Sequence, residues 1–344
     1  MYSFSLVLLI LPMLFPPQEQ DSLRHPDETR LRNIRQLTFG GTNAEAYFSF
    51  DDRRLIFQST RPPFDCDQIF TMNVDGSEQF LVSNGKGVTT CAYFLPDRKR
   101  ILYSSTFYEK EKCSSRPDKS NGYVWGVWDA YDLYTANADG SDIRVLSRSP
   151  RYDAEATISP MGDKIVFTSS RDGDLDLYTM NLDGSDVQRI TQELGYDGGA
   201  FFSWDGKRIV YRAFHHTDSI AAKEYKALLA EQLVKPTRME IFVCDADGKN
   251  RKRLTNSEGA NFAPFFHPDN KRIIFSSNSD APGSRLFHLY IMNDDGTKKN
   301  QVTSGGTFNA FPMFSRDGKQ LVFVSDRNAR ERYEFNIFLA DWVE

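Results

Sequence analysis

Short polar side chains recur along this chain, each six residues before a repeated anchor position. They are Asn43, Thr89, Asp153, Asp197, Asn261 and Asn309. Two residues beyond the first and the third of them, Glu45 and Glu155 add carboxylates. Carboxylate and amide oxygens gathered around one opening could bind a cation, a polar ligand or a side chain of a partner. The alternative is structural, because short polar side chains also cap turns that lead into strands.

Histidine adds little to this set, because the only adjacent pair is His215 and His216. Neighbouring residues in extended backbone point in opposite directions, so the pair makes poor co-ligands by itself. One of them could join Asp197 or Glu155 as a metal ligand or a general base. No nucleophile elbow, phosphate loop, dinucleotide turn or His-Glu-x-x-His motif occurs. The sequence therefore predicts no catalytic residue and no cofactor, and leaves open a metal ion bound by residues of distant repeats.

An internal repeat spaces these residues. Each anchor is followed eight residues later by an aromatic residue, and a second aromatic column comes after that. The anchors are Ser49, Leu95, Ser159, Ser203, His267 and Ser315, at intervals of 46, 64, 44, 64 and 48 residues. The first aromatic column is Phe57, Tyr103, Phe167, Tyr211, Phe275 and Phe323, and the second is Phe70, Tyr134, Tyr178, Phe242, Tyr290 and Phe338. A column present in every repeat indicates core packing rather than a ligand site.

Four short strands in a repeat of this length are typical of a β-propeller blade. In the third repeat the strands are expected near 156–159, 164–168, 176–180 and 187–191. The sixth repeat lacks an outer strand, and residues 33–38 near the other end of the chain can supply it. Pairing the two ends closes the ring and removes its open edges. The sequence therefore predicts an all-β, six-bladed β-propeller over residues 33–344.

Two insertions account for the long intervals, and both leave between the second and third strands of a blade. Residues 107–129, in blade 2, carry Trp125 and Trp128; residues 214–239, in blade 4, contain a predicted helix from 219 to 234. Both belong to the face where the innermost strands begin, which we call the top face. Because only blade 3 separates them, they could wall a groove over the channel. Long loops in compact domains are often functional.

Four cysteines are present, without a Cys-x-x-Cys pair that would indicate structural zinc. Cys66, Cys91 and Cys113 all fall on the top face, which allows a Cys66–Cys113 disulfide or, as the second choice, Cys91–Cys113. Cys244 lies in a third strand and is expected to be buried. Arg61, Arg171 and Arg327 recur after second strands and are expected to bridge blades. Residues 172–176 resemble the start of a calcium loop, but Leu177 replaces the glycine that such a loop needs.

Residues 1–16 are apolar and uncharged, too short to span a membrane and of the length of a signal-peptide core. Residues 17–32 are polar and are expected to be a linker. We therefore expect an exported protein without a membrane span in its mature form. A net charge of −5 argues against a nucleic-acid partner.

Several segments carry a resemblance to a known family. Phe48-Ser49-Phe50-Asp51-Asp52, Ile158-Ser159-Pro160-Met161-Gly162-Asp163-Lys164, Phe314-Ser315-Arg316-Asp317-Gly318-Lys319 and Tyr178-Thr179-Met180-Asn181-Leu182-Asp183-Gly184 resemble the propeller repeats of the TolB family. The resemblance covers about residues 33–344. It implies a six-bladed ring in the periplasm that binds a peptidoglycan-associated lipoprotein at its mouth. TolB carries an α/β domain before its propeller, and about thirty residues of this sequence come before the first predicted strand, so we do not expect binding to other Tol proteins through such a domain.

Similar repeats accompany hydrolase domains in enzymes that resemble prolyl oligopeptidase, but no hydrolase domain is present in this sequence. We therefore expect a monomeric, non-enzymatic scaffold that binds a protein or an envelope component through its channel mouth and top face. The expected binding residues are Asn43, Glu45, Asp153, Glu155, Asp197, His215, His216, Asn261, Asn309, Trp125 and Trp128. The alternative is a metal-dependent propeller enzyme, a lyase or a lactonase or other hydrolase, with its site at the channel mouth.

Overall fold

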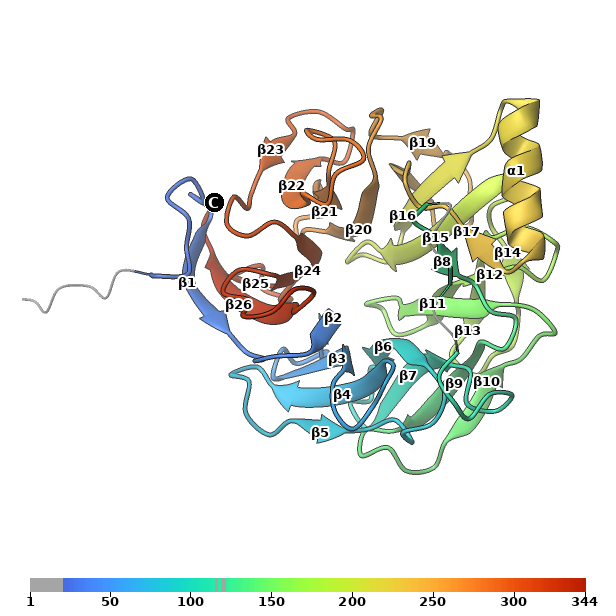
Figure 1. Ribbon diagram of the computed structural model, residues 1–344, viewed down its shortest axis with the longest axis horizontal. Helices are drawn as coiled ribbons and strands as arrows, with labels where there is room; N and C mark the ends of the chain where they lie inside the picture. Colours follow the sequence, from blue (N-terminus) through green and yellow to red (C-terminus); the bar gives the residue numbers. More distant parts are fainter. Residues whose placement is uncertain (1–20, 115–116, 119–121) are drawn as a thin grey trace, which may run out of the picture.

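The computed structural model describes residues 21–114, 117–118 and 122–344 as a ring of six four-stranded sheets (Figure 1). The predicted signal segment 1–16 lies outside the described residues. Each sheet is antiparallel and runs outward from the ring axis. Blades 1 to 3 are β2 (Thr42–Phe48), β3 (Arg54–Thr60), β4 (Gln68–Asn73) and β5 (Phe80–Leu81); β6 (Thr89–Phe94), β7 (Arg100–Ser105), β9 (Asp132–Asn137) and β10 (Arg144–Ser147); and β11 (Asp153–Ile158), β12 (Lys164–Ser169), β13 (Asp176–Asn181) and β14 (Gln188–Arg189). Blades 4 and 5 are β15 (Gly195–Phe202), β16 (Arg208–His215), β18 (Glu240–Asp245) and β19 (Lys252–Arg253); and β20 (Asn261–Phe266), β21 (Arg272–Ser277), β22 (His288–Asn293) and β23 (Asn300–Gln301).

The sixth blade contains both ends of the described chain, which confirms the predicted closure. Its strands are β24 (Asn309–Phe314), β25 (Gln320–Ser325), β26 (Asn336–Trp342) and, on the outside, β1 (Leu31–Gln36). β1 pairs antiparallel with β26, with Leu31 opposite Trp342 and Gln36 opposite Phe338. The closing strand thus begins two residues before its predicted start.

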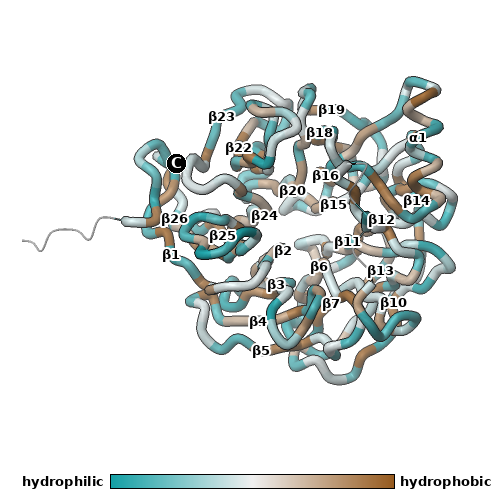
Figure 2. The backbone as a smooth tube through the Cα atoms, in the orientation of Figure 1, coloured by the Kyte–Doolittle hydropathy of each residue, from teal (hydrophilic) through white to brown (hydrophobic). Residues whose placement is uncertain are grey.

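The repeated aromatic columns form the core between blades. Phe57, Tyr103, Phe167, Tyr211, Phe275 and Phe323 are at most 1 % exposed. Hydrophobic residues follow the strands and hydrophilic ones the loops (Figure 2). Burial of these rings holds neighbouring sheets face to face, because a single blade cannot cover its own apolar surfaces.

The segment expected to be a linker instead packs against the ring where it is described. Glu28 is fully buried, and its carboxylate lies 2.8 Å from Nη2 of Arg327. It also accepts hydrogen bonds from the amides of Ser304 and Gly305, between blades 5 and 6. A charge with this many partners fixes the segment, so Arg327 bridges blade 6 to the chain before β1 rather than to a neighbouring blade alone.

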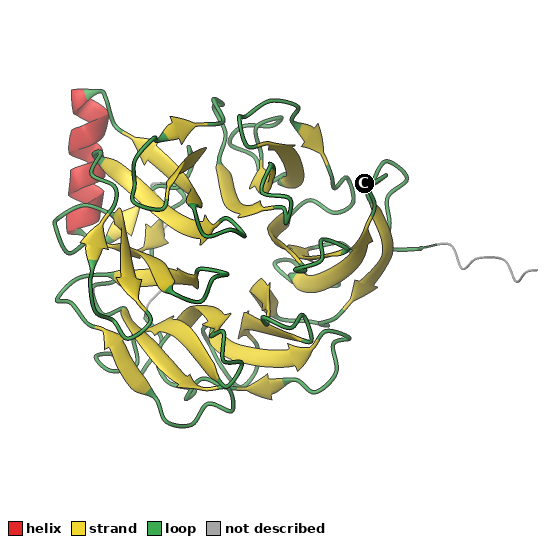
Figure 3. Ribbon diagram, turned by 180° about the vertical axis from the view of Figure 1, so that it is seen from behind, coloured by secondary structure: helices red, strands yellow, loops and turns green. Residues whose placement is uncertain are grey.

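The two insertions join each other across blade 3. β8 (Trp125–Gly126), from the blade 2 insertion, pairs antiparallel with β17 (Leu233–Val234), from the blade 4 insertion. The helix α1 (Ser219–Ala230) begins after its N-cap Asp218 and lies at the rim of the ring (Figures 1 and 3). The predicted helix extended to 234, which is wrong: Gln232 adopts a positive φ of 59°, and the next two residues form β17. Among the described residues, no helix has the length and apolarity needed to cross a membrane.

Candidate functional site

The repeated polar residues are buried inside the blades. They lie near the start of each inner strand, and none is more than 2 % exposed. In three blades the second strand contributes a serine whose hydroxyl donates to them: Ser59 to Asn43 (2.9 Å), Ser169 to Asp153 (2.6 Å) and Ser277 to Asn261 (2.7 Å). The amides of Asn43, Asn261 and Asn309 donate to backbone carbonyls before the third strand of the adjacent blade. For Asn43, Asp153, Asn261 and Asn309, the contacts in the structure are thus with neighbouring strands.

Two residues beyond each of them, every inner strand contains the same β-bulge. The residue there has a φ between 48° and 57°, in the left-handed region, and the register of the strand pair shifts around it. These six residues, which we call the axial layer, are Glu45, Cys91, Glu155, Gly199, Ala263 and Phe311. A left-handed residue in all six strands, five of them not glycine, is uncommon, and bulges of this kind redirect side chains next to functional sites.

Glu155 has the richest set of contacts in the axial layer. It forms an ion pair with Nη2 of Arg212, from the second strand of blade 4. It also accepts hydrogen bonds from the hydroxyls of Tyr196 (2.7 Å) and Thr168 (2.8 Å) and from the amide of Gly199 (2.9 Å). Burial opposes ionisation of Glu155, but Arg212 and these donors outweigh it and hold its pKa below the usual value. Glu155 is thus a fixed carboxylate.

Two glycines make room for this ion pair. A Cβ on Gly198 would overlap the Glu155 carboxylate, and one on Gly199 would overlap the guanidinium of Arg212. Arg212 therefore fills the place that a side chain of the axial layer takes in other blades. Trp125 of β8 covers the guanidinium from the insertion side, with Cζ of Arg212 5.3 Å from its ring centroid.

Glu45 lies in the same layer without a comparable partner. Burial raises the pKa of Glu45 to about 7, the thiol of Cys91 lowers it in part, and the Glu155 carboxylate raises it again. Glu45 and Glu155 therefore differ in ionisation near neutral pH although they occupy equivalent positions. Two neighbouring carboxyl groups with different pKa values are common where proteins bind or transfer protons.

An aromatic layer closes the axis just below. Tyr47 of blade 1 and Phe201 of blade 4, which face each other across the ring, have ring centroids 5.4 Å apart. Tyr93 lies 5.5 Å from Tyr47, and Phe265 lies 5.2 Å from Phe201. All four are at most 6 % exposed. A ligand that reaches the axial layer must therefore enter from the top face.

The two halves of the mouth differ in character. On blades 5 and 6, Phe262 packs against Phe287 (5.2 Å) and Phe311 (5.7 Å), and Phe308 packs against Phe335 (4.7 Å). All except Phe262 are partly exposed. On blades 1 to 4 the mouth contains the carboxyl, thiol and guanidinium groups described above. One half therefore offers hydrogen bonds and charge, and the other offers an apolar wall.

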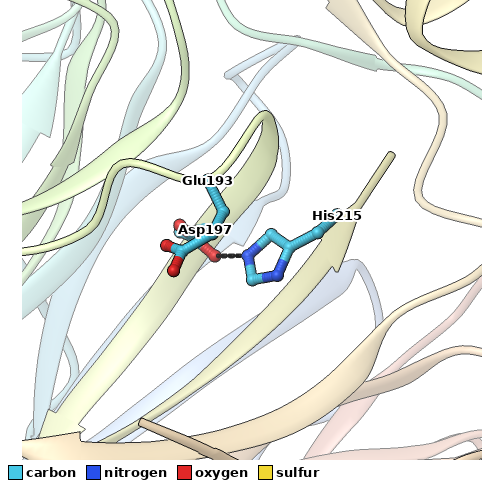
Figure 4. A group of neighbouring side chains, drawn as sticks. All are labelled: Glu193, Asp197 and His215. Carbon is cyan, nitrogen blue, oxygen red and sulfur yellow. Dashed lines mark hydrogen bonds and ion pairs between the residues drawn. The ribbon is translucent and has the colours of Figure 1, made fainter. Parts of the chain in front are cut away.

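Asp197 and His215 form a hydrogen bond of 2.8 Å, and Glu193 lies beside them (Figure 4). One potential ligand atom from each lies within 4.8 Å of the others, a donor set that could hold a divalent metal. His215 occupies the place that Arg171 takes in blade 3, where Nη2 of Arg171 lies 2.8 Å from Asp153. The pair thus has a structural counterpart in the repeat.

The remaining predicted site residues lie apart from the axial layer. His216 stacks on Tyr225 of α1 at 4.7 Å, and burial lowers its pKa. Trp128 packs below Lys110 and lines a hollow of about 460 Å³ with residues 110–114. Cys66 and Cys113 form a disulfide, the first of the two pairings considered, which ties the blade 2 insertion to blade 1.

Sequence reasoning missed Arg212, Tyr196 and the role of Cys91 in the axial layer. Arg212 is the one charged residue in its column of the second strands, and it lies opposite Gly198. A charged residue on an inward-facing strand position, paired with consecutive glycines, was the available signal.

Comparison with known proteins agrees with this architecture. The family model described as the TolB beta propeller domain matches residues 124–235 and 234–337. No curated protein matches. A TolB structure from Agrobacterium tumefaciens is 15 % identical, with a TM-score of 0.60, and the alignment covers 90 % of this chain and 97 % of that one.

Two further structures share the fold. TolB from Acinetobacter baumannii is 19 % identical with a TM-score of 0.58, over 89 % of this chain and 64 % of that one, so this chain spans less than two thirds of it. An oligogalacturonate lyase in complex with manganese is 14 % identical with a TM-score of 0.52, over 90 % and 93 % of the two chains. At these identities the likeness establishes the fold, while the family match covers more than half of the sequence. The chain belongs to the TolB beta propeller domain family.

Proposed function

We propose that this chain is an exported, non-enzymatic binding protein that recognises a protein or an envelope component at the top face of its propeller. The observation that carries the proposal is the asymmetric mouth: above the aromatic layer that closes the axis, charged and polar groups lie on one side and phenylalanines on the other. Polar groups of blades 1 to 4 and partly exposed phenylalanines of blades 5 and 6 surround the same axis. Mixed apolar and polar surfaces of this kind are typical of recognition sites.

The insertions support the same proposal. Their pairing through β8 and β17 holds Trp125 over Arg212, so the wall of the mouth is part of the folded domain. Binding sites formed by loops on a rigid scaffold are the usual arrangement in propellers and related folds. Export is proposed from the apolar N-terminal segment, and a periplasmic partner from the family resemblance, for which a peptidoglycan-associated lipoprotein is the example.

Site-specific photo-crosslinking in cells that express the chain tests this proposal. A crosslinking residue at Tyr333, exposed at 50 % on the top face, is expected to capture a discrete partner. The matched control is the same residue at Met161, exposed at 62 % in a turn on the opposite face. Capture at Tyr333 that a Trp125→Ala substitution abolishes would support the proposal. Equal capture at both positions, or none at Tyr333, would contradict it.

A metal-dependent enzyme is the second candidate, because Glu193, Asp197 and His215 could together hold an ion. Glu193 also pairs with Arg251, which a metal would have to displace. Elemental analysis of the purified chain distinguishes the candidates. About one metal ion per chain that is lost in Asp197→Asn would favour the enzyme. Equal metal content in the wild type and this variant would exclude these residues as a metal site.

A further inference from the structure

We propose that Glu45 and the tyrosines beside it take up a primary ammonium group on an aliphatic stem, such as the lysine side chain of a protein partner. This inference deepens the proposed function and rests on it for the identity of the partner. The site is defined by Glu45, Tyr47, Tyr131, Tyr152 and Phe311.

Glu45 supplies the negative charge in its ionised form, which predominates above its pKa of about 7. Its carboxyl group interacts electrostatically with Cys91, Glu155 and Arg212, which belong to blades 2, 3 and 4, so it faces the ring axis. Within the described part of the chain, its one hydrogen-bond donor is the thiol of Cys91, which is a weak donor. Arg212, the basic residue that acts on it, is committed to Glu155. The carboxyl group is therefore available to a cation that enters from outside.

Three tyrosines supply further acceptors. Tyr47, Tyr131 and Tyr152 are only 6 %, 7 % and 6 % exposed, and within the described residues their hydroxyls make no hydrogen bond. Burial raises the pKa of all three tyrosines. The carboxyl group of Glu45 adds to this for Tyr47 and, to a smaller extent, for Tyr131, and that of Glu155 adds to it for Tyr152, so the rings lie near the axial carboxyl groups. The rings are buried, but none of these three hydroxyl oxygens is among the fully buried atoms without a partner, so each keeps contact with solvent and can accept a hydrogen bond from a ligand. An ammonium group has three donors and no acceptor, which matches a carboxylate and phenol oxygens.

The apolar half of the mouth suits the stem. Phe311 occupies the axial layer in blade 6, which adjoins blade 1 and therefore Glu45. It packs with Phe262, 5.7 Å away, and Ala263 occupies the same layer in blade 5. A chain of methylenes would be buried along this wall while its end reached Glu45. Neither a carboxylate nor an uncharged head group would satisfy Glu45 in this way.

Three ligands with one stem test the head group on the full chain. We expect n-pentylamine to bind, as followed by ligand-observed NMR, and 1-pentanol and hexanoate to bind at least about tenfold more weakly, because only the amine offers a charged donor to Glu45. Glu45→Gln, which keeps the size and the backbone preference, should reduce amine binding about tenfold or more. Glu224→Gln on the exposed side of α1 is the matched control and should bind like the wild type. Equal binding of the amine and the alcohol, or unchanged binding in Glu45→Gln, would overturn the inference.

Tyr152→Phe gives a second check, because it keeps the ring and removes one hydroxyl; we expect binding of the amine to fall a few-fold. Crosslinking at Tyr333 separates this inference from the proposed function. If a partner is captured equally by the wild type and Glu45→Gln, and pentylamine does not compete, the ammonium site fails while the binding function stands. If pentylamine binds through Glu45 but no partner is captured, the site stands and the proposed partner function fails.

Discussion

The guanidinium of Arg212 occupies the position that a Cβ atom on Gly199 would take. The other five residues of the axial layer have side chains at nearly the same φ, and Ala263 shows that alanine is tolerated there at 48°. The glycine in blade 4 is therefore required by its neighbour and not by its backbone. In this way one blade of a repeated structure has been altered to place a cation beside the axis.

Gly199→Ala should consequently destabilise the fold, because the new methyl group displaces Arg212 from Glu155. We expect the free energy of unfolding to fall by about 2–4 kcal/mol, measured by urea denaturation. Gly283→Ala is the control, since Gly283 also has a positive φ (76°) but has nothing within 4 Å of its Cβ position. Its loss should be only about 1 kcal/mol. Equal losses in the two variants would show that the backbone conformation, and not Arg212, determines the cost.

Removing the guanidinium alone should leave a buried carboxylate without its counter-ion. The side chains of Arg212 and Glu155 are only 9 % and 13 % exposed. We expect Arg212→Met to lose about 3–5 kcal/mol of stability at pH 7, and the double variant Arg212→Met with Glu155→Gln to recover a large part of it. Because the pKa of Glu155 is lowered in the folded state, the stabilisation that this pair provides should also be lost as the pH falls through that pKa. A double variant no more stable than the single one would contradict the pairing.

Glu45 should give the opposite dependence on pH. Its folded-state pKa is raised from 4.5 to about 7, so folding favours the protonated form. Between these two values the unfolded chain ionises first, and the wild type should lose up to about 3 kcal/mol relative to Glu45→Gln as the pH rises from 4.5 to 7. Above pH 7 the difference should stay constant. Thermal unfolding across this range checks the prediction, and parallel curves for the two proteins would refute it.

The Cys66–Cys113 disulfide should stabilise the attachment of the blade 2 insertion. It closes a segment with a sequence separation of 47 residues. We expect Cys113→Ser to lose about 2–4 kcal/mol, and the wild type to fall to the same stability when reduced. Cys66→Ser serves as the control, because removing either partner should have one and the same effect. Different stabilities for the two variants would indicate a contribution beyond the disulfide.

The repeat made the ring predictable, because six copies of each aromatic column could arise only from a structure with six equivalent interfaces. The missing strand of the last copy likewise predicted closure by residues near 33–38. The sequence did not predict features that depend on contacts between different copies of the repeat. Glu45, Cys91, Gly199 and Phe311 have no side-chain property in common, so their shared bulge left no pattern in the sequence. The helix end was misplaced because Leu233 and Val234 pair with a segment more than one hundred residues away.

For the polar site residues, the sequence identified real positions but could not rank the two interpretations. Asp153 and Asp197 look alike as residue types, and only the structure shows that each is enclosed with a basic side chain. The sequence did not distinguish Tyr47, Tyr131 and Tyr152 from the many aromatic residues that pack in the core. Only the structure shows that, among the described residues, nothing forms a hydrogen bond with their hydroxyl groups.

Pairing of β1 with β26 also governs when the fold can be completed during synthesis. The two strands are separated by almost the whole described sequence, so β1, the outer strand of blade 6, has no partner until β26 has left the ribosome. Contacts of such long sequence separation form late and slowly. We therefore expect nascent chains truncated before Asn336 to remain sensitive to protease, and resistance to appear only once β26 is available. The ring behaves in this respect as a single cooperative unit, although its blades are repeats.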